Sequence, residues 1–291
     1  MMRLFKGRGG VRAGWRFLAY LVLLAALAAG VGRLEFWFVM TLHLRDDLAP
    51  VPLLLDELTL LIPVLVATLV MAWFERRSVL SYGFTPSRTA AVPRLIEGAV
   101  LGAILTAIVA VLMLLFGGMR IESFGLHGWG WIAYPLGWAA VMLLVGFTEE
   151  AVFRGYPLIA LARGIGFLPA SLVVTLLFGA AHLGKAGENA IDIGNIMLLA
   201  LVICFSFWRT GSLWLAVGFH SAFDFMQIFV IGTRNGSQVP VGTLLHATFP
   251  GPAWVNGGPL GTEASIFVLP LTLALFLYIA WRHPHRRLVL D

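Results

Sequence analysis

The sequence predicts an all-α, polytopic transmembrane helical bundle of about eight spans, with a polar site buried among spans 4, 5 and 7. Hydrophobic residues make up 59% of the 291 residues, and charged residues only 12%. Soluble domains carry about 25% charged residues, so composition excludes a soluble domain. The apolar runs are long and unbroken, unlike the alternating segments of about 10 residues in a transmembrane barrel. The single cysteine, Cys204, excludes an internal disulfide.

Eight segments approach the length of about 20 mostly apolar residues that a membrane-crossing helix requires. They are 17–40, 51–73, 95–117, 131–160, 166–184, 193–208, 211–232 and 265–281. The connection 233–264 is rich in Gly and Pro and is predicted to be an extracytoplasmic loop. No repeat and no separate soluble domain is visible, so residues 1–291 are predicted to form one integral membrane domain.

The positions of Lys and Arg predict an orientation, because cytoplasmic loops are enriched in these residues. With the N-terminus in the cytoplasm, 14 of the 20 lie on the cytoplasmic face, five lie on the other face, and Arg154 lies within a span. Both termini are therefore predicted to be cytoplasmic. This bias also explains the net charge of +5 without a nucleic-acid partner. The basic start and Leu21–Leu27 also resemble a signal peptide, but the apolar run continues through Phe36–Met40 and favours a retained span.

Ionisable residues lie inside the fourth predicted span, in the string GFTEEAVFRGYPL. Each such residue costs about 2.5–3.5 kcal/mol at the middle of a membrane helix, so Glu149, Glu150 and Arg154 should face the protein interior. Glu150 and Arg154 are spaced i,i+4 and suit a structural pair. Glu149 is rotated by about 100° from Glu150, which leaves it free to face something else.

Two more polar motifs follow in later spans. Phe178 and His182 share one helix face, and so do His220 and Asp224, because each pair is spaced i,i+4. A rise of about 1.5 Å per residue places Glu149, His182 and the His220/Asp224 pair at similar depths. Each feature also has a structural interpretation, as a helix-to-helix hydrogen bond or a buried ion pair. Their agreement in depth favours a functional site within a core at 131–232.

The predicted site suits hydrolysis by an activated water. A carboxylate in a low-dielectric setting can act as a general base, and an imidazole can assist it or stabilise a developing oxyanion. Ser221 follows His220 directly, and adjacent helix positions do not face each other, so no Ser nucleophile with its own base is evident. The His-Glu-x-x-His zinc motif is absent as well.

In this order and spacing, the three motifs resemble those of the CAAX-protease and bacteriocin-processing family of intramembrane peptidases, also called abortive-infection-like. The motifs are Glu149-Glu150-x-x-x-Arg154, Phe178-x-x-x-His182 and His220-x-x-x-Asp224. The resemblance implies that Glu149 activates water with help from His182. It also implies that His220 and Asp224 stabilise the oxyanion, while Glu150, Arg154 and Phe178 support the site.

One departure from the family leaves two questions open. Many members have Asn where this chain has Asp224, and an ionised Asp cannot donate a hydrogen bond. Asp224 is therefore either protonated or orients His220. A metal is a further alternative, with Zn²⁺ bound by His182, His220 and Glu149 and one position open. The glutamate mechanism needs no metal, so we favour no cofactor.

The resemblance implies an endopeptidase of a bacterial inner membrane that cleaves a membrane-associated peptide or protein. Its partners would be that substrate and the lipid bilayer. Two alternatives belong to other classes. One is a non-catalytic membrane scaffold or immunity factor with the same fold. The other is a proton-coupled transporter, although no matched pair of Gly/Pro-broken spans supports it.

Overall fold

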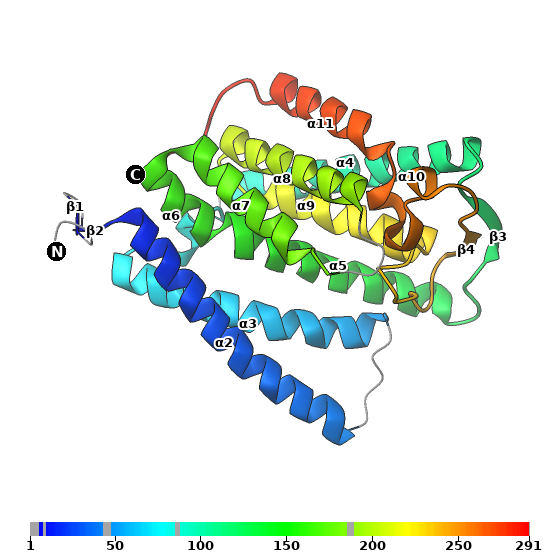
Figure 1. Ribbon diagram of the computed structural model, residues 1–291, viewed down its shortest axis with the longest axis horizontal. Coiled ribbons are helices and arrows are strands. Elements are labelled where there is room, and N and C mark those ends of the chain that lie inside the picture. Colours follow the sequence, from blue (N-terminus) through cyan, green and yellow to red (C-terminus); the bar gives the residue numbers. More distant parts are fainter. Residues whose placement is uncertain (1–5, 8–9, 43–47, 85–87, 185–188, 291) are drawn as a thin grey trace.

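The computed structural model describes residues 6–7, 10–42, 48–84, 88–184 and 189–290 and is built almost entirely of helices (Figure 1). The first half contains β1 (Lys6–Gly7), β2 (Gly10–Val11), α2 (Ala13–Leu42), α3 (Pro50–Glu75), η1 (Val79–Ser81), α4 (Arg88–Leu115), β3 (Arg120–Phe124) and α5 (Gly130–Arg154). The second half contains α6 (Tyr156–Ile165), α7 (Phe167–Ala181), α8 (Ala190–Thr210), α9 (Trp214–Asp224), η2 (Phe225–Ile231), β4 (Leu245–Thr248), α10 (Ala253–Asn256), η3 (Gly258–Ala264) and α11 (Val268–Arg282).

Seven helices in the described part of the chain are long and apolar enough to cross a membrane. The eighth predicted span, 166–184, corresponds to α7, which has 15 residues. At about 1.5 Å per residue α7 is roughly 22 Å long, against a hydrocarbon core of about 30 Å. The start of α2 and the end of α11 lie at the same end of the bundle (Figure 1), as expected if α7 is a shorter eighth pass.

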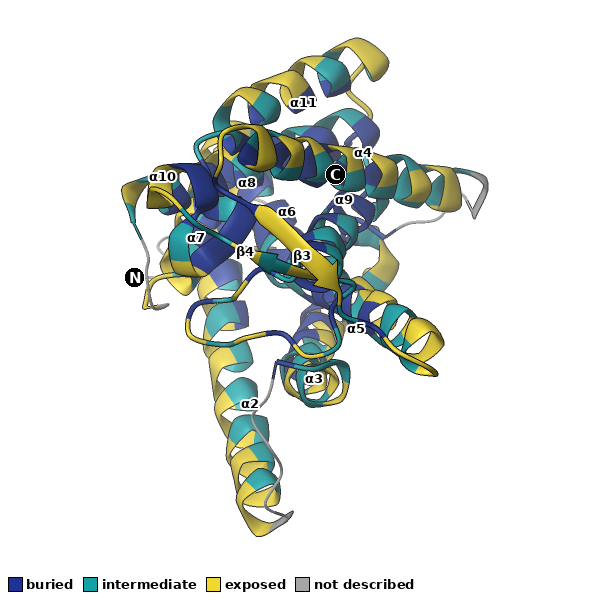
Figure 2. Cartoon of the chain, turned by 90° about the vertical axis from the view of Figure 1, so that its right-hand side faces the viewer, coloured by how far each residue is buried: buried dark blue, intermediate teal, exposed yellow. Residues whose placement is uncertain are grey.

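The outer faces of the bundle are apolar. Phe36 and Trp37 on α2, and Leu273 and Leu277 on α11, are all more than half exposed, and Figure 2 shows exposed residues along both helices. Large exposed apolar surfaces are rare on soluble monomers. In a bilayer they contact lipid, while the helices satisfy their own backbone hydrogen bonds. The exposed surface and the seven long helices together suggest an integral membrane protein.

The fourth predicted span, 131–160, is interrupted in the structure. Helix α5 ends at Arg154 and α6 begins at Tyr156, because Gly155 has a non-helical ψ of −117°. A Cβ at Gly155 would lie 2.5 Å from the carbonyl oxygen of Ala151, so the tight break favours glycine. The continuous apolar run concealed this break. Its effect is to place the acidic motif in the last two turns of α5.

Glycines bring α9 into direct backbone contact with α4. A Cβ at Gly98 or Gly102 of α4 would overlap the carbonyl oxygen of Leu215 or Phe219 on α9. In the other direction, a Cβ at Gly218 would overlap the carbonyl oxygen of Leu95. Small residues allow such close approach in membrane bundles. The packing fixes the height and rotation of α9, the helix that carries His220 and Asp224.

The end of the bundle near the termini is held together at Glu75, the last residue of α3. Its Oε1 accepts a hydrogen bond of 2.6 Å from the Tyr156 hydroxyl, and its Oε2 accepts one of 3.1 Å from Tyr82. Burial and the charge of Glu75 raise the pKa of Tyr82 to about 12, so Tyr82 stays a donor. Arg163 lies 3.4 Å from the same carboxylate. These contacts join α3 to Tyr82, directly after η1, and to α6.

The segment 233–264, predicted as a loop, contains short regular elements at the opposite end of the bundle (Figure 1). Strand β4 pairs antiparallel with β3, with Arg120 opposite Thr248 and Phe124 opposite Leu245. The amide of Asn195 on α8 donates to the carbonyl oxygens of Glu263 and Ser265, at 2.7 and 2.9 Å. The segment is therefore fixed against the helices and reaches the site described next.

Candidate active site

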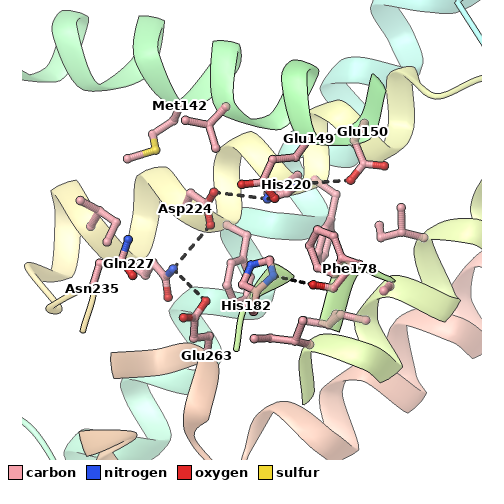
Figure 3. A pocket seen from close by; sticks show the side chains of 18 of the residues that line it. Met142, Glu149, Glu150, Phe178, His182, His220, Asp224, Gln227, Asn235 and Glu263 are labelled. Atoms are coloured by element: carbon pink, nitrogen blue, oxygen red, sulfur yellow. Dashed lines mark hydrogen bonds and ion pairs between the residues drawn. The ribbon is translucent and has the colours of Figure 1, made fainter. Parts of the chain in front are cut away.

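A cavity of about 170 Å³ lies inside the bundle and contains every residue predicted for the site. Figure 3 shows its side chains converging from α5, α7, α9 and η3. The polar residues that line it are Glu57, Glu149, Glu150, Arg154, His182, His220, Asp224, Gln227, Arg234, Asn235 and Glu263. Phe178 and apolar side chains from α3, α5, α8 and α9 complete the lining.

His220 is at the centre of the acidic groups. Its Nδ1 lies 3.0 Å from Glu150 Oε1. Its Nε2 lies 3.4 Å from Asp224 Oδ2 and 3.7 Å from Glu149 Oε2. An ionised carboxylate can only accept hydrogen bonds, so Nδ1 is a donor to Glu150. Both Nε2 distances exceed the usual hydrogen-bond range of about 2.7–3.2 Å. An Nε2–H group at this position can therefore still donate a hydrogen bond to another acceptor.

Glu150 and Arg154 form a buried ion pair, as their spacing predicts. Arg154 donates to Glu150 Oε1 at 2.7 Å, and the side chains are only 2% and 1% exposed. The guanidinium lies 4.6 Å from the centre of the Phe178 ring, a cation–π contact. Arg154 therefore holds the Glu150 carboxylate, which in turn fixes the orientation of the His220 ring.

His182 is oriented by the helix that precedes it. It caps the C-terminal end of α7, and its Nδ1 lies 2.8 Å from the carbonyl oxygen of Phe178. A carbonyl oxygen only accepts, so Nδ1 carries the hydrogen and Nε2 has the lone pair when the ring is neutral. The Phe178 and His182 rings lie 4.5 Å apart.

Glu149 is the most accessible of the central acids. Its side chain is 23% exposed, against 1% for Glu150. Among the described residues, its Oε2 has no hydrogen-bond partner. The two adjacent acids therefore differ as the rotation about α5 predicts. Glu150 is committed to Arg154 and His220, whereas Glu149 faces the cavity (Figure 3).

The predicted zinc alternative does not fit this arrangement. The part of the chain that the structure describes contains no group of three or more His, Cys, Asp or Glu side chains that could hold a metal ion. We therefore derive no chemical step through a metal.

Comparison with known families identifies the segment that carries this site. Residues 129–226 match the model of the type II CAAX prenyl endopeptidase Rce1-like family. This segment is an Rce1-like domain. It extends from the start of α5 to the start of η2 and contains all seven predicted site residues. The predicted family is thereby confirmed. The chain matches no curated protein and no solved structure.

Several cavity residues lie outside the Rce1-like domain and were not predicted. Glu57 comes from α3, Gln227 directly follows the matched segment, and Asn235 and Glu263 come from the segment 233–264. Glu57 carried a usable signal, since an acid inside an apolar span is a candidate by default. Gln227 carried a similar signal, since it is a polar residue inside the predicted span 211–232. Asn235 and Glu263 had none, because a polar residue in a loop is ordinary. The Rce1-like domain thus supplies the motifs, and flanking segments complete the cavity.

Proposed function

We propose that the protein is an intramembrane endopeptidase that hydrolyses a peptide bond of a membrane-associated protein or peptide. Membership of the Rce1-like family suggests a protease and therefore a protein substrate. The observation that carries the finer proposal is the accessible Glu149 carboxylate, which shares one cavity with His182 and His220 inside that domain.

Glu149 acts as the general base in this proposal. It takes a proton from water, and the hydroxide bonds to the carbonyl carbon while an electron pair moves onto the carbonyl oxygen. The C–N bond then breaks as the nitrogen takes that proton from Glu149, which gives a carboxylic acid and an amine. His182 Nε2 has the lone pair in the neutral ring, so it can accept a hydrogen bond from the same water.

In this proposal His220 carries a hydrogen on both ring nitrogens, among the carboxylates of Glu149, Glu150 and Asp224, and stabilises the oxyanion through Nε2–H. Asp224 acts as an acceptor that orients His220, because its Oδ2 faces His220 Nε2 and its Oδ1 faces the amide nitrogen of Gln227. This role explains how Asp replaces the Asn of many relatives. Glu150, Arg154 and Phe178 hold His220 and His182 in place.

The test uses an internally quenched farnesylated peptide, with its unprenylated form as a second probe. Purified protein in liposomes should cleave at least one of them, and Glu149→Gln should lower the rate by about 10²- to 10⁴-fold. Glu122→Gln is the matched control, since Glu122 is an exposed acid on β3, and it should cleave like the parent. Undiminished cleavage by Glu149→Gln would overturn the proposal. If Glu149→Gln cleaves neither peptide but keeps the biological activity of the parent in cells, the result would instead favour the scaffold function.

We propose further that both termini face the cytoplasm of a bacterial inner membrane. The placement of Lys and Arg supports this, as does the location of the start of α2 and the end of α11 at one end of the bundle. A fluorescent protein fused after Asp291 should then be fluorescent, and a periplasmic reporter at the same place should be inactive. The reverse pattern would contradict the orientation.

A further inference from the structure

Gln227 lies at the edge of the cavity between two carboxylates (Figure 3). Its Nε2 makes two long hydrogen bonds, of 3.5 Å to Asp224 Oδ1 and 3.4 Å to Glu263 Oε2. Its Oε1 accepts a hydrogen bond of 2.8 Å from the hydroxyl of Thr262. The residue is only 5% exposed. Asp224, Glu263 and Thr262 therefore all form hydrogen bonds with a nearly buried amide.

The chemistry of these neighbours fixes which way the amide points. Ionised carboxylates only accept, so the amide nitrogen must face Asp224 and Glu263. That nitrogen has two hydrogens, one for each carboxylate. The Thr262 hydroxyl then donates to the amide oxygen. The amide nitrogen is thus the donor that lies between the two carboxylates.

Gln227 and Glu263 are both anchored through their backbone carbonyl oxygens. Gln227 belongs to the π-helical segment η2, and its carbonyl oxygen accepts hydrogen bonds of 3.0 Å from both the amide and the hydroxyl of Thr233. π-Helical turns are rare and concentrate at functional sites. Glu263 is fixed through its own carbonyl oxygen by Asn195. The bridge therefore joins two anchored segments.

We propose that Gln227 is a positioning residue for the reaction, whose amide bridges Asp224 and Glu263 and so holds Asp224 toward His220. This inference rests on the proposed peptidase function. It also gives the segment 258–264 a role, since Thr262 and Glu263 fix the amide from outside the Rce1-like domain.

Exchange of donor and acceptor distinguishes positioning from mere packing. Gln227→Glu replaces the donor by a third carboxylate and should break the bridge. In an Asp224→Asn background, residue 224 can turn its own amide nitrogen toward a glutamate at 227, which restores one donor–acceptor pair. Gln227→Met removes all three side-chain hydrogen bonds at similar size. Packing alone predicts that the cost of Gln227→Glu is the same in both backgrounds.

The kinetic experiment measures kcat and KM for Gln227→Glu, Asp224→Asn and the double variant, with the farnesylated quenched peptide. We expect Gln227→Glu to lower kcat by about tenfold or more in the parent with little change in KM. In the Asp224→Asn background its cost should fall to about threefold or less. Effects that multiply, or Gln227→Met with the kcat of the parent, would overturn the inference.

A second cycle on the same variants uses thermal unfolding midpoints in detergent and needs no substrate. The fall in midpoint for the double variant should be smaller than the sum of the falls for Gln227→Glu and Asp224→Asn alone. A fall equal to that sum would contradict the bridge. Thr262→Val should lower the midpoint, with Thr272→Val as the control for loss of a buried hydroxyl elsewhere, on α11. If the parent cleaves nothing, the proposed function fails and this cycle still decides the bridge. If cleavage depends on Glu149 but the effects of the two substitutions simply add in both the kinetic and the thermal experiment, the bridge is wrong and the peptidase function stands.

Discussion

Gly146 of α5 lies so close to Ser221 of α9 that a Cβ at position 146 would overlap the serine hydroxyl. That hydroxyl cannot readily move, because it donates to the carbonyl oxygen of Val217 at 2.7 Å. Ser221 directly follows His220, and Gly146 is one turn before Glu149 and Glu150. The contact therefore sets the spacing between the two acids and the imidazole that lies between them.

Gly146→Ala should separate α5 from α9 and lower kcat/KM by about 10- to 100-fold, since a displacement of about 1 Å can cost 10²-fold. Gly30→Ala on α2 is the matched control, because a Cβ there meets none of the described atoms within 4 Å. Cleavage of the farnesylated peptide by both variants measures the effect. Equal activities would show that this contact does not set the site geometry.

Arg154→Met should strongly destabilise the protein. It leaves Glu150 buried without its cation, a change that costs about 3–5 kcal/mol for a buried pair. The midpoint of thermal unfolding in detergent should fall accordingly, and Glu150→Met combined with Arg154→Met should recover part of the loss. A double variant less stable than Arg154→Met would show that Arg154 does not act by compensating the buried charge of Glu150.

Phe178→Leu should lower activity more than stability. The ring contacts the Arg154 guanidinium at 4.6 Å and the His182 ring at 4.5 Å, so its removal frees two groups of the site. A lost cation–π contact of about 1–2 kcal/mol and a mobile His182 predict a fall in kcat of about tenfold. Phe116→Leu, at an exposed position just after α4, serves as the control. A kcat equal to that of the control would argue against this support.

Chelation should leave the reaction unchanged. The glutamate mechanism requires no metal, and the described residues provide no group of three ligands. Incubation with 1,10-phenanthroline, followed by dialysis, should leave cleavage of the farnesylated peptide as before. The metal content of the purified protein should not correlate with activity. Loss of activity that added Zn²⁺ restores would instead support the metal alternative.

Local periodicity predicted the contacts within single helices. The i,i+4 spacing placed Arg154 on Glu150, Asp224 near His220 and His182 against Phe178, and all three contacts are present. Such pairs follow from the geometry of one helix. The break at Gly155 was missed, because hydropathy does not register one glycine within an apolar run.

Contacts between segments distant in the sequence could not be predicted in the same way. Glu149 and Glu150 were expected to face different partners, yet both lie near His220, one toward each ring nitrogen. Rotation about α5 distinguishes the two acids. This rotation cannot reveal that His220 of α9 lies between the two acids, with one ring nitrogen near each of them.

The sequence by itself determined that the chain is a bundle of membrane-spanning helices, where most of its spans lie, and which residues form the three polar motifs. Hydropathy and helical repeat suffice for this, because both act over one or two turns of chain. Only the tertiary structure decided that Glu57, Gln227 and Glu263 join the motifs in one cavity. That outcome depends on which helix faces meet. Backbone contacts at glycines such as Gly98 and Gly146 fix those faces, and no local pattern in the chain encodes their partners.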